Sequence, residues 1–162
     1  MHFRAITARF GALYLAALLL AAFPAGAHEF ELGELDIEHP WSRQTPTGAK
    51  IAVGYLIIKN GSSTPERLVS ATADIAGKVE FHEMTMTEGV MTMRPLGDGL
   101  EIPAGDEARF EPGGYHLMFK DLKRAPIKGE TFAGTLTFEK AGTIAVEFIV
   151  EAPAGNHGDH GG

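Results

Sequence analysis

The sequence predicts a single all-β domain, folded as a Greek-key β-sandwich or barrel. Apolar and polar residues alternate with the period of a strand in many short runs. Gly, Pro, Asn and Asp separate these runs, as they separate the strands of antiparallel sheets. No segment has the pattern of a long amphipathic helix, and 162 residues with 44% hydrophobic residues are enough to bury one core.

The first 27 residues are expected to be a secretory signal peptide. Arg4 and Arg9 precede an apolar run at 10–23, and small residues at 25–27 follow it. The run is shorter than the roughly 18 to 20 residues that a membrane-spanning helix needs. The mature chain would therefore be exported and begin at His28, without stable insertion in the membrane after removal of the signal.

Ten runs in the mature chain are expected to be strands, each ending at turn residues before the next begins. In chain order they are 34–38, 51–59, 67–73, 78–86, 90–94, 100–102, 108–111, 115–119, 131–139 and 143–151. The turns expected between them are Asn60-Gly61, Glu88-Gly89, Gly97-Asp98-Gly99, Pro103-Ala104-Gly105, Pro112-Gly113-Gly114 and Ala141-Gly142. The strands are expected to share one core in a domain spanning 28–151, and the small and polar residues of 152–162 to form a disordered tail.

The absence of cysteine excludes several classes of site. Without a thiol the sequence cannot form disulfides, thiolate zinc sites, iron–sulfur clusters, a catalytic cysteine or a blue-copper centre. The formal net charge of −7 comes without a cluster of Lys and Arg, so we do not expect nucleic-acid binding. No nucleophile elbow, P-loop or dinucleotide fingerprint occurs, so we expect a binding protein rather than an enzyme.

Methionine and histidine are concentrated in one window. Every methionine after Met1, and two of the histidines, lie within residues 82–118. Side chains alternate across a strand, so each expected strand here has an aliphatic or aromatic face and an opposite face. The opposite faces carry, strand by strand, Glu80, His82, Met84 and Met86; Met91 and Met93; and His116 and Met118. We therefore expect these side chains to point outward, away from the core.

Three interpretations of this pattern are open. Methionines fill gaps in cores, and a methionine-rich surface can also contact another protein. The third interpretation is a soft-metal site, because the uncharged and polarizable thioether suits Cu(I) and imidazole adds a stronger donor. A thioether also forms no disulfide, which suits an oxidising exported compartment. We favour the metal site because it explains why the thioethers share faces with histidine.

Three segments resemble the periplasmic copper chaperone family PCuAC. They are VEFHEM at 79–84, GVMTMRP at 89–95 and GGYHLM at 113–118. Further runs are similar to landmarks of that family and extend the resemblance over nearly all of 34–151; they lie at 40–43, 52–56, 100–105 and 136–142. The resemblance implies a cupredoxin-like fold and a surface-exposed Cu(I) site.

The signature of this family is a His, a Met eleven positions on, and a His-x-Met further along. It maps onto His82, Met93, His116 and Met118. The interval between Met93 and His116 contains 22 residues, one more than the family form, which leaves Met91 as an alternative to Met93.

Three further methionines, Met84, Met86 and Met91, are candidates for auxiliary copper ligands. The resemblance implies a metallochaperone that delivers copper toward the dinuclear centre of cytochrome c oxidase. Its copper-accepting partners would be subunit II of that enzyme or Sco-type chaperones.

Three more histidines suggest other sites. His157 and His160 in the tail suit a weaker Cu(II) site, with a solvated, metal-free tail as the alternative. His28, as the mature N-terminus, could chelate Cu(II) and make the protein a copper-dependent redox enzyme instead. A β-sandwich interaction module without metal is the remaining alternative. The carboxylates beside His82, Glu80 and Glu83, are expected to form a solvated polar face, with a contact that orients the imidazole of His82 as the alternative.

Overall fold

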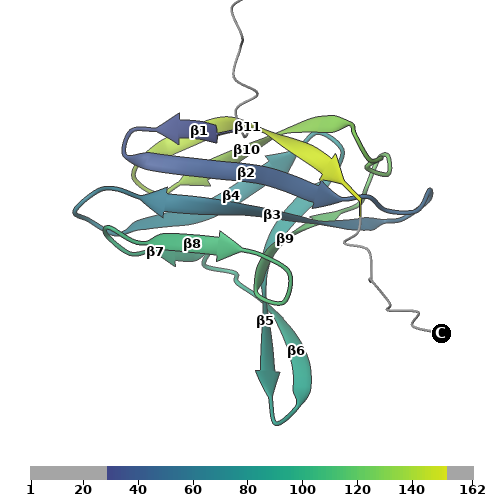
Figure 1. Cartoon of the computed structure of the whole chain (residues 1–162), viewed down its shortest axis with the longest axis horizontal. Helices are drawn as coiled ribbons and strands as arrows, with labels where there is room; N and C mark the ends of the chain where they lie inside the picture. Colours follow the sequence, from purple (N-terminus) through teal and green to yellow (C-terminus); the bar gives the residue numbers. More distant parts are fainter. Residues whose placement is uncertain (1–28, 153–162) are drawn as a thin grey trace, which may run out of the picture.

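The computed structural model describes residues 29–152, which form eleven β-strands and no helix (Figure 1). In chain order the strands are β1 (Glu29–Leu32), β2 (Leu35–Arg43), β3 (Ile51–Asn60), β4 (Glu66–Ala73), β5 (Lys78–Thr87), β6 (Val90–Pro95), β7 (Leu100–Ile102), β8 (Glu107–Phe110), β9 (Tyr115–Lys120), β10 (Thr131–Phe138) and β11 (Gly142–Glu151). Within the described range, no helix exists that could cross a bilayer. The expected signal peptide, and the expected tail beyond residue 152, lie outside the described residues.

All ten expected strands are present, but the N-terminal part of the domain differs from the prediction. β1 is an additional strand, paired with β2. The prediction that the next strand ends at residue 38 is wrong, because β2 continues to Arg43. His39 has a φ of 46°, and the pairing with β3 shifts between Glu38 and Trp41. This bulge takes Pro40, which has no amide hydrogen, out of the ladder, so the strand can continue past it.

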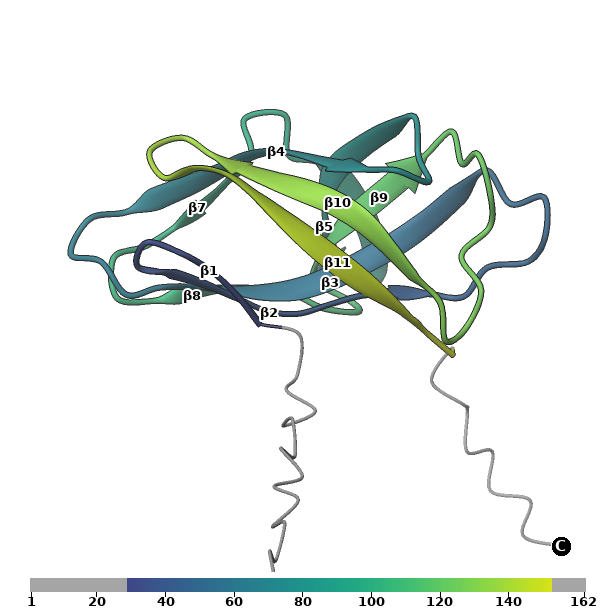
Figure 2. The same ribbon diagram turned by 90° about the horizontal axis from the view of Figure 1, so that it is seen from above.

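The strands form one sheet that folds over on itself. Their order in the sheet is β6-β5-β9-β8-β3-β2-β11-β10-β4-β7, with β1 on β2 and a further pairing between β9 and β3. The pairings of β2 with β11 and of β8 with β9 are parallel, unlike the antiparallel sheet that the sequence predicted. β2 and β11 are far apart in the chain, whereas β8 and β9 are consecutive strands that meet at a single pair, Phe110 and Tyr115. In Figure 2, β10 and β11 cross the direction of β3.

Aromatic rings fill the space between the facing layers. Phe119 of β9 meets Phe132 of β10 and Phe148 of β11, with ring centroids 5.3 and 5.4 Å apart, although these strands are not neighbours in the sheet. Gly54 makes room for this ring, because a Cβ at position 54 would lie 2.5 Å from Cε2 of Phe119. The packing of Phe119 holds β9, the strand that carries His116, against the rest of the core.

The β5–β6 hairpin projects from the body of the molecule (Figure 1). β5 pairs with β9 only as far as Glu83, whereas its pairing with β6 continues to Thr87. Glu88 and Gly89 make the turn with φ values of 53° and 79°, the two left-handed positions that a type I′ turn requires. The outer part of the hairpin is therefore a two-stranded ribbon, and every residue of β6 is exposed.

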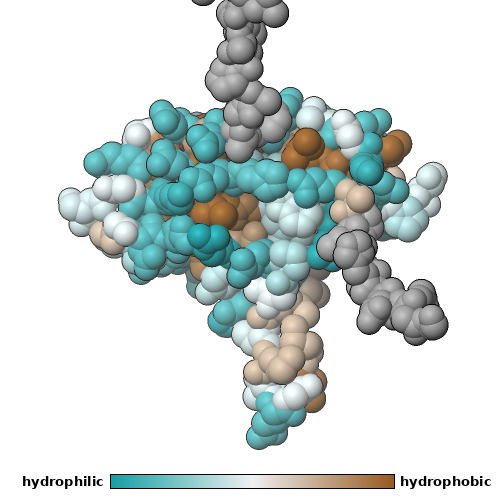
Figure 3. All heavy atoms as spheres, in the orientation of Figure 1, coloured by the Kyte–Doolittle hydropathy of each residue, from teal (hydrophilic) through white to brown (hydrophobic). Residues whose placement is uncertain are grey.

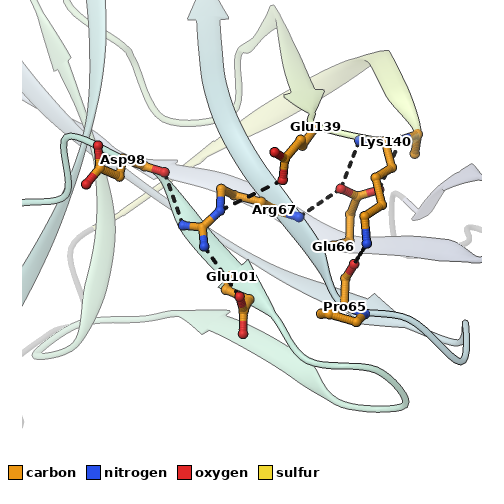
Figure 4. A network of polar contacts seen from close by, with 8 residues as sticks. Pro65, Glu66, Arg67, Asp98, Glu101, Glu139 and Lys140 are labelled. Carbon is orange, nitrogen blue, oxygen red and sulfur yellow. Dashed lines mark hydrogen bonds and ion pairs between the residues drawn. The ribbon is translucent and has the colours of Figure 1, made fainter.

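A buried carboxylate ties β4 to the turn between β10 and β11 (Figure 4). Glu66 is buried and accepts hydrogen bonds from the backbone N–H groups of Arg67, Lys140 and Ala141 at 2.8, 3.0 and 2.9 Å. Burial raises the pKa of Glu66, but the three hydrogen bonds together outweigh burial and leave that pKa below its ordinary value. The carboxylate thus satisfies three backbone donors while ionised.

Replacing Glu66→Gln is expected to lower the free energy of unfolding by about 1 to 3 kcal/mol at neutral pH, because the amide NH2 cannot accept the hydrogen bond of Ala141. Urea denaturation measures this change. Since the folded pKa of Glu66 is lowered, its contribution is present above the ordinary carboxyl pKa and is lost as the pH falls through the folded pKa. The difference between variant and unaltered protein should therefore shrink in acid. The exposed Glu139→Gln at the same turn is the control, and equal stability of Glu66→Gln and the unaltered protein at neutral pH would contradict the assignment.

Candidate metal centre

Two histidines meet across neighbouring strands. His82 in β5 and His116 in β9 are Cα partners in an antiparallel pairing. Their ring centroids are 5.7 Å apart and the ring planes are inclined by 29°. Because metal–nitrogen bonds to imidazole are roughly 2 Å long, two rings at this separation can turn their nitrogens toward one ion.

The pairing continues the same face in both directions along the strands. On one side of the histidine row, Met118 lies opposite Glu80. On the other side, the next row pairs Met84 with Met93, and the row after that pairs Met86 with Met91. Residues two apart on a strand share a face, so successive rows are about 6.8 Å apart. We call this surface the His–Met face; its members are His82, Met84, Met86, Met91, Met93, His116 and Met118.

The prediction that the whole face is exposed is wrong for the histidines. His82 and His116 are only 7% and 6% exposed, whereas Met86 and Met93 are 69% and 48% exposed. At His82, β5 has a paired strand on either side, and beyond Met84 it has β6 alone. The histidine row therefore belongs to the body of the domain, and the outer methionine rows belong to the projecting hairpin.

Each imidazole has one nitrogen held by a hydrogen bond and the other left as a donor atom. Nε2 of His82 lies 2.9 Å from Oε2 of Glu80, while its Nδ1 is buried without a hydrogen-bond partner. Nδ1 of His116 lies 3.2 Å from the carbonyl oxygen of Gly114. Carboxylate and carbonyl oxygens only accept, so the proton sits on Nε2 of His82 and on Nδ1 of His116. The lone pairs of His82 Nδ1 and His116 Nε2 are then available to a metal ion.

Glu80 contacts His82, which was the less favoured of the two interpretations that the sequence left open. Instead of a solvated carboxylate, the structure has an ion-paired one, with Nζ of Lys78 at 2.7 Å and Nζ of Lys120 at 3.3 Å. Hydrogen bonds from Lys78 and His82 lower the pKa of Glu80 to about 2, so it is ionised at physiological pH. A carboxylate on the outer nitrogen of a ligand histidine orients the ring and makes the other nitrogen more basic. The signal in the sequence was the position of Glu80, two residues before His82 on the same face.

The donor set is suited to a soft ion. Among residues 29–152, no three side chains of His, Cys, Asp and Glu come together to hold a metal. The His–Met face instead combines two imidazole nitrogens with neutral thioethers, which suits a soft monovalent cation. A groove of about 600 Å³ borders Met84 and Gly114, and carboxylates outnumber cations in its lining, which favours the approach of a cation. The carboxylates are Glu83, Glu101, Asp106, Glu107 and Glu111, and the one cation of the lining is Arg109, which pairs with Glu107.

Among the described residues, His39 is the one histidine outside this face. It lies in the bulge of β2, where its Nε2 is 2.8 Å from Oε1 of Glu151. His28, His157 and His160 lie outside the described residues.

Comparison with known proteins identifies a related family. A family model described as "Putative lipoprotein LpqE-like" matches residues 35–150. A related protein, "Putative lipoprotein Lxx21020" of Leifsonia xyli subsp. xyli, is 29% identical over 128 residues, which are 79% of this chain and 76% of that protein.

Solved structures of PCuAC domains are similar to this chain. The "Copper-bound PCuAC domain from PmoF2" has a TM-score of 0.66 and 30% identity, and the match covers 78% of this chain and 99% of that domain. The solution structure of CuI-DR1885 from Deinococcus radiodurans has a TM-score of 0.54 and 25% identity, covering 78% and 83% of the two chains. These matches and the all-β sheet confirm the predicted cupredoxin-like fold class.

In the metal-free protein, nitrogen-15 NMR is expected to find opposite tautomers for the two histidines, with the proton on Nε2 of His82 and on Nδ1 of His116. Replacing Glu80→Ala should let His82 sample both tautomers while His116 keeps its own, because only His82 loses its acceptor. The same tautomer in both rings of the unaltered protein would contradict this assignment.

Acid is expected to destabilise the fold through His116. Burial lowers the pKa of His116, and the hydrogen bond to Gly114 only partly offsets this effect. The unfolded chain takes up the proton at about pH 6.5, so the free energy of unfolding should fall as the pH drops below that value and level off below the folded pKa. Urea denaturation over this range measures the slope, and His116→Asn should flatten it. An equally steep slope in the variant would refute the role of His116.

Proposed function

We propose that this chain, which belongs to the LpqE-like lipoprotein family, is an exported copper metallochaperone and not an enzyme. It binds Cu(I) at the His–Met face and passes the ion to an acceptor protein. The observation that carries the proposal is the pairing of His82 with His116 in a row flanked by thioethers on both sides. Two comparisons support it: the names of the family and the relative describe lipoproteins, and the titles of two similar structures name bound copper.

The proposed primary ligands are His82, Met93, His116 and Met118. Met118 lies one row to one side of the histidines and Met93 one row to the other, so thioethers can approach an ion from both sides. Met91 lies one row further out, which favours Met93 over Met91 for this site. Met84, directly opposite Met93, is the nearest auxiliary donor.

The mixture of buried and exposed ligands suits transfer. The buried imidazoles hold the ion away from bulk water, while the half-exposed thioether of Met93 remains within reach of a ligand from another protein. A thioether binds without releasing a proton, and exchanging one neutral ligand for another transfers no electron. Met93 can therefore be replaced by a ligand of another protein while the copper stays Cu(I). The proposed acceptors are copper-site proteins such as subunit II of cytochrome c oxidase or a Sco-type chaperone, and the proposed compartment is the periplasm.

A second, weaker copper site is proposed for His157 and His160. Imidazole with nearby carboxylate and backbone groups suits Cu(II) better than thioether does. Titration of Cu(II) into a chain ending at Glu151 tests this site, with the loss of one bound Cu(II) as the expected result. An unchanged stoichiometry would remove the tail from the proposal.

The primary site is tested by anaerobic titration of Cu(I) against a competing chelator. Loss of a group that only supports a ligand costs about 10- to 100-fold in metal affinity, so Met93→Leu with Met118→Leu should weaken Cu(I) binding by at least that factor. Leucine preserves volume and removes the sulfur. Thr85→Ala with Thr92→Ala, a pair on the other face of the same hairpin, is the matched control and should bind as the unaltered protein does.

Undiminished Cu(I) affinity in the double leucine variant would defeat the ligand assignment. A protein that retains no copper after gel filtration would instead support an interaction module without metal.

A further inference from the structure

The outer part of the β5–β6 hairpin carries four thioethers on one face. Met84 is the Cα partner of Met93, and Met86 is the partner of Met91. The threonine pair between these two rows faces the other way. The primary copper site uses at most the inner row, which leaves the pair at the tip without an assigned role.

The register brings the Cα atoms of each methionine pair close together. In an antiparallel ladder, hydrogen-bonded pairs alternate with pairs that are not hydrogen-bonded, whose Cα atoms are only about 4.5 Å apart. The amide of Leu96 donates to the carbonyl of Phe81 at 2.8 Å, so that end of the hairpin is hydrogen-bonded. The two-residue turn is also flanked by a hydrogen-bonded pair. Because the two kinds of pair alternate along the hairpin, both methionine pairs are of the kind that is not hydrogen-bonded and has the shorter Cα separation.

Packing does not explain the methionines at the tip. Met86 is 69% exposed and Met91 is 45% exposed, so neither fills a gap in the core. β6 is the last strand at its end of the sheet, so no further strand of the described chain pairs along its outer side. Figure 3 shows apolar surface along this projecting hairpin, in the orientation of Figure 1. Exposed apolar groups gathered on one projecting element indicate a binding role.

We propose that Met86 and Met91 form a second site for a soft monovalent cation, Cu(I) or Ag(I), at the tip of the hairpin. Two neutral sulfurs held across a narrow pair can bind one ion from opposite sides, without deprotonation and without change of oxidation state. The next thioethers inward, on Met84 and Met93, lie about 6.8 Å along the ribbon. The choice of Cu(I) as the natural ion rests on the proposed function, whereas the site itself rests on the register and the exposure of the tip.

The test is a titration of the full metal-free chain with Ag(I), followed by NMR through the methyl resonances of carbon-13-labelled methionine and the ring resonances of labelled histidine. Ag(I) has the charge and softness of Cu(I) and is not oxidised by air. The first equivalent is expected to shift the ring signals of His82 and His116, and a second equivalent to shift the methyl signals of Met86 and Met91. Met86→Leu with Met91→Leu should lose the second equivalent and keep the first. Thr85→Ala with Thr92→Ala should keep both.

The proposal is overturned if an excess of Ag(I) leaves the methyl signals of Met86 and Met91 unshifted, or if the double leucine variant binds as many ions as the unaltered protein. Failure of the proposed function gives a different result. In that case the ring signals of His82 and His116 do not respond to the ion, whatever the tip pair does.

Discussion

The proposed metal centre depends on one constraint, the register in which β5 lies between β9 and β6. Because side chains alternate along a strand, a slip of one residue would turn His82 and the methionines of β5 to the other face. The register is held at both ends: the aromatic packing of Phe119 anchors β9 in the core, and the type I′ turn at Glu88 and Gly89 sets the pairing of the hairpin. The donors of the His–Met face can therefore be aligned without any metal present.

The His–Met face is buried at the histidines and exposed at the outer methionines, and the donor atoms differ between these two ends. At the body end, buried imidazoles have fixed tautomers, because ionised Glu80 accepts from His82 and the Gly114 carbonyl accepts from His116. At the hairpin end, exposed thioethers need no such support, since they carry neither a proton nor a charge. The strong donors thus lie where water is excluded, and the weaker, exchangeable donors lie where another protein can reach them.

The sequence was sufficient for the strands from residue 51 onward, for the turns between them and for the face that each donor occupies, because these follow from local alternation and turn chemistry. It could not show which strands become neighbours, so the burial of His82 between β6 and β9 was missed. The ion pairing of Glu80 was missed for the same reason, since Lys120 comes from a distant strand. The bulge at His39 was also unpredictable, because Pro40 ordinarily ends a strand and the pairing of the next residues with both β3 and β11 carries the chain past it.

The central claim is that imidazole nitrogens and thioether sulfurs bind the same Cu(I) ion. X-ray absorption spectroscopy of the protein loaded with one equivalent of Cu(I) tests it most directly, because it reads the donor atoms without altering the chain. The account predicts a first coordination sphere with both nitrogen at about 2.0 Å and sulfur at about 2.3 Å. A sphere of nitrogen and oxygen alone, with no sulfur, would contradict it.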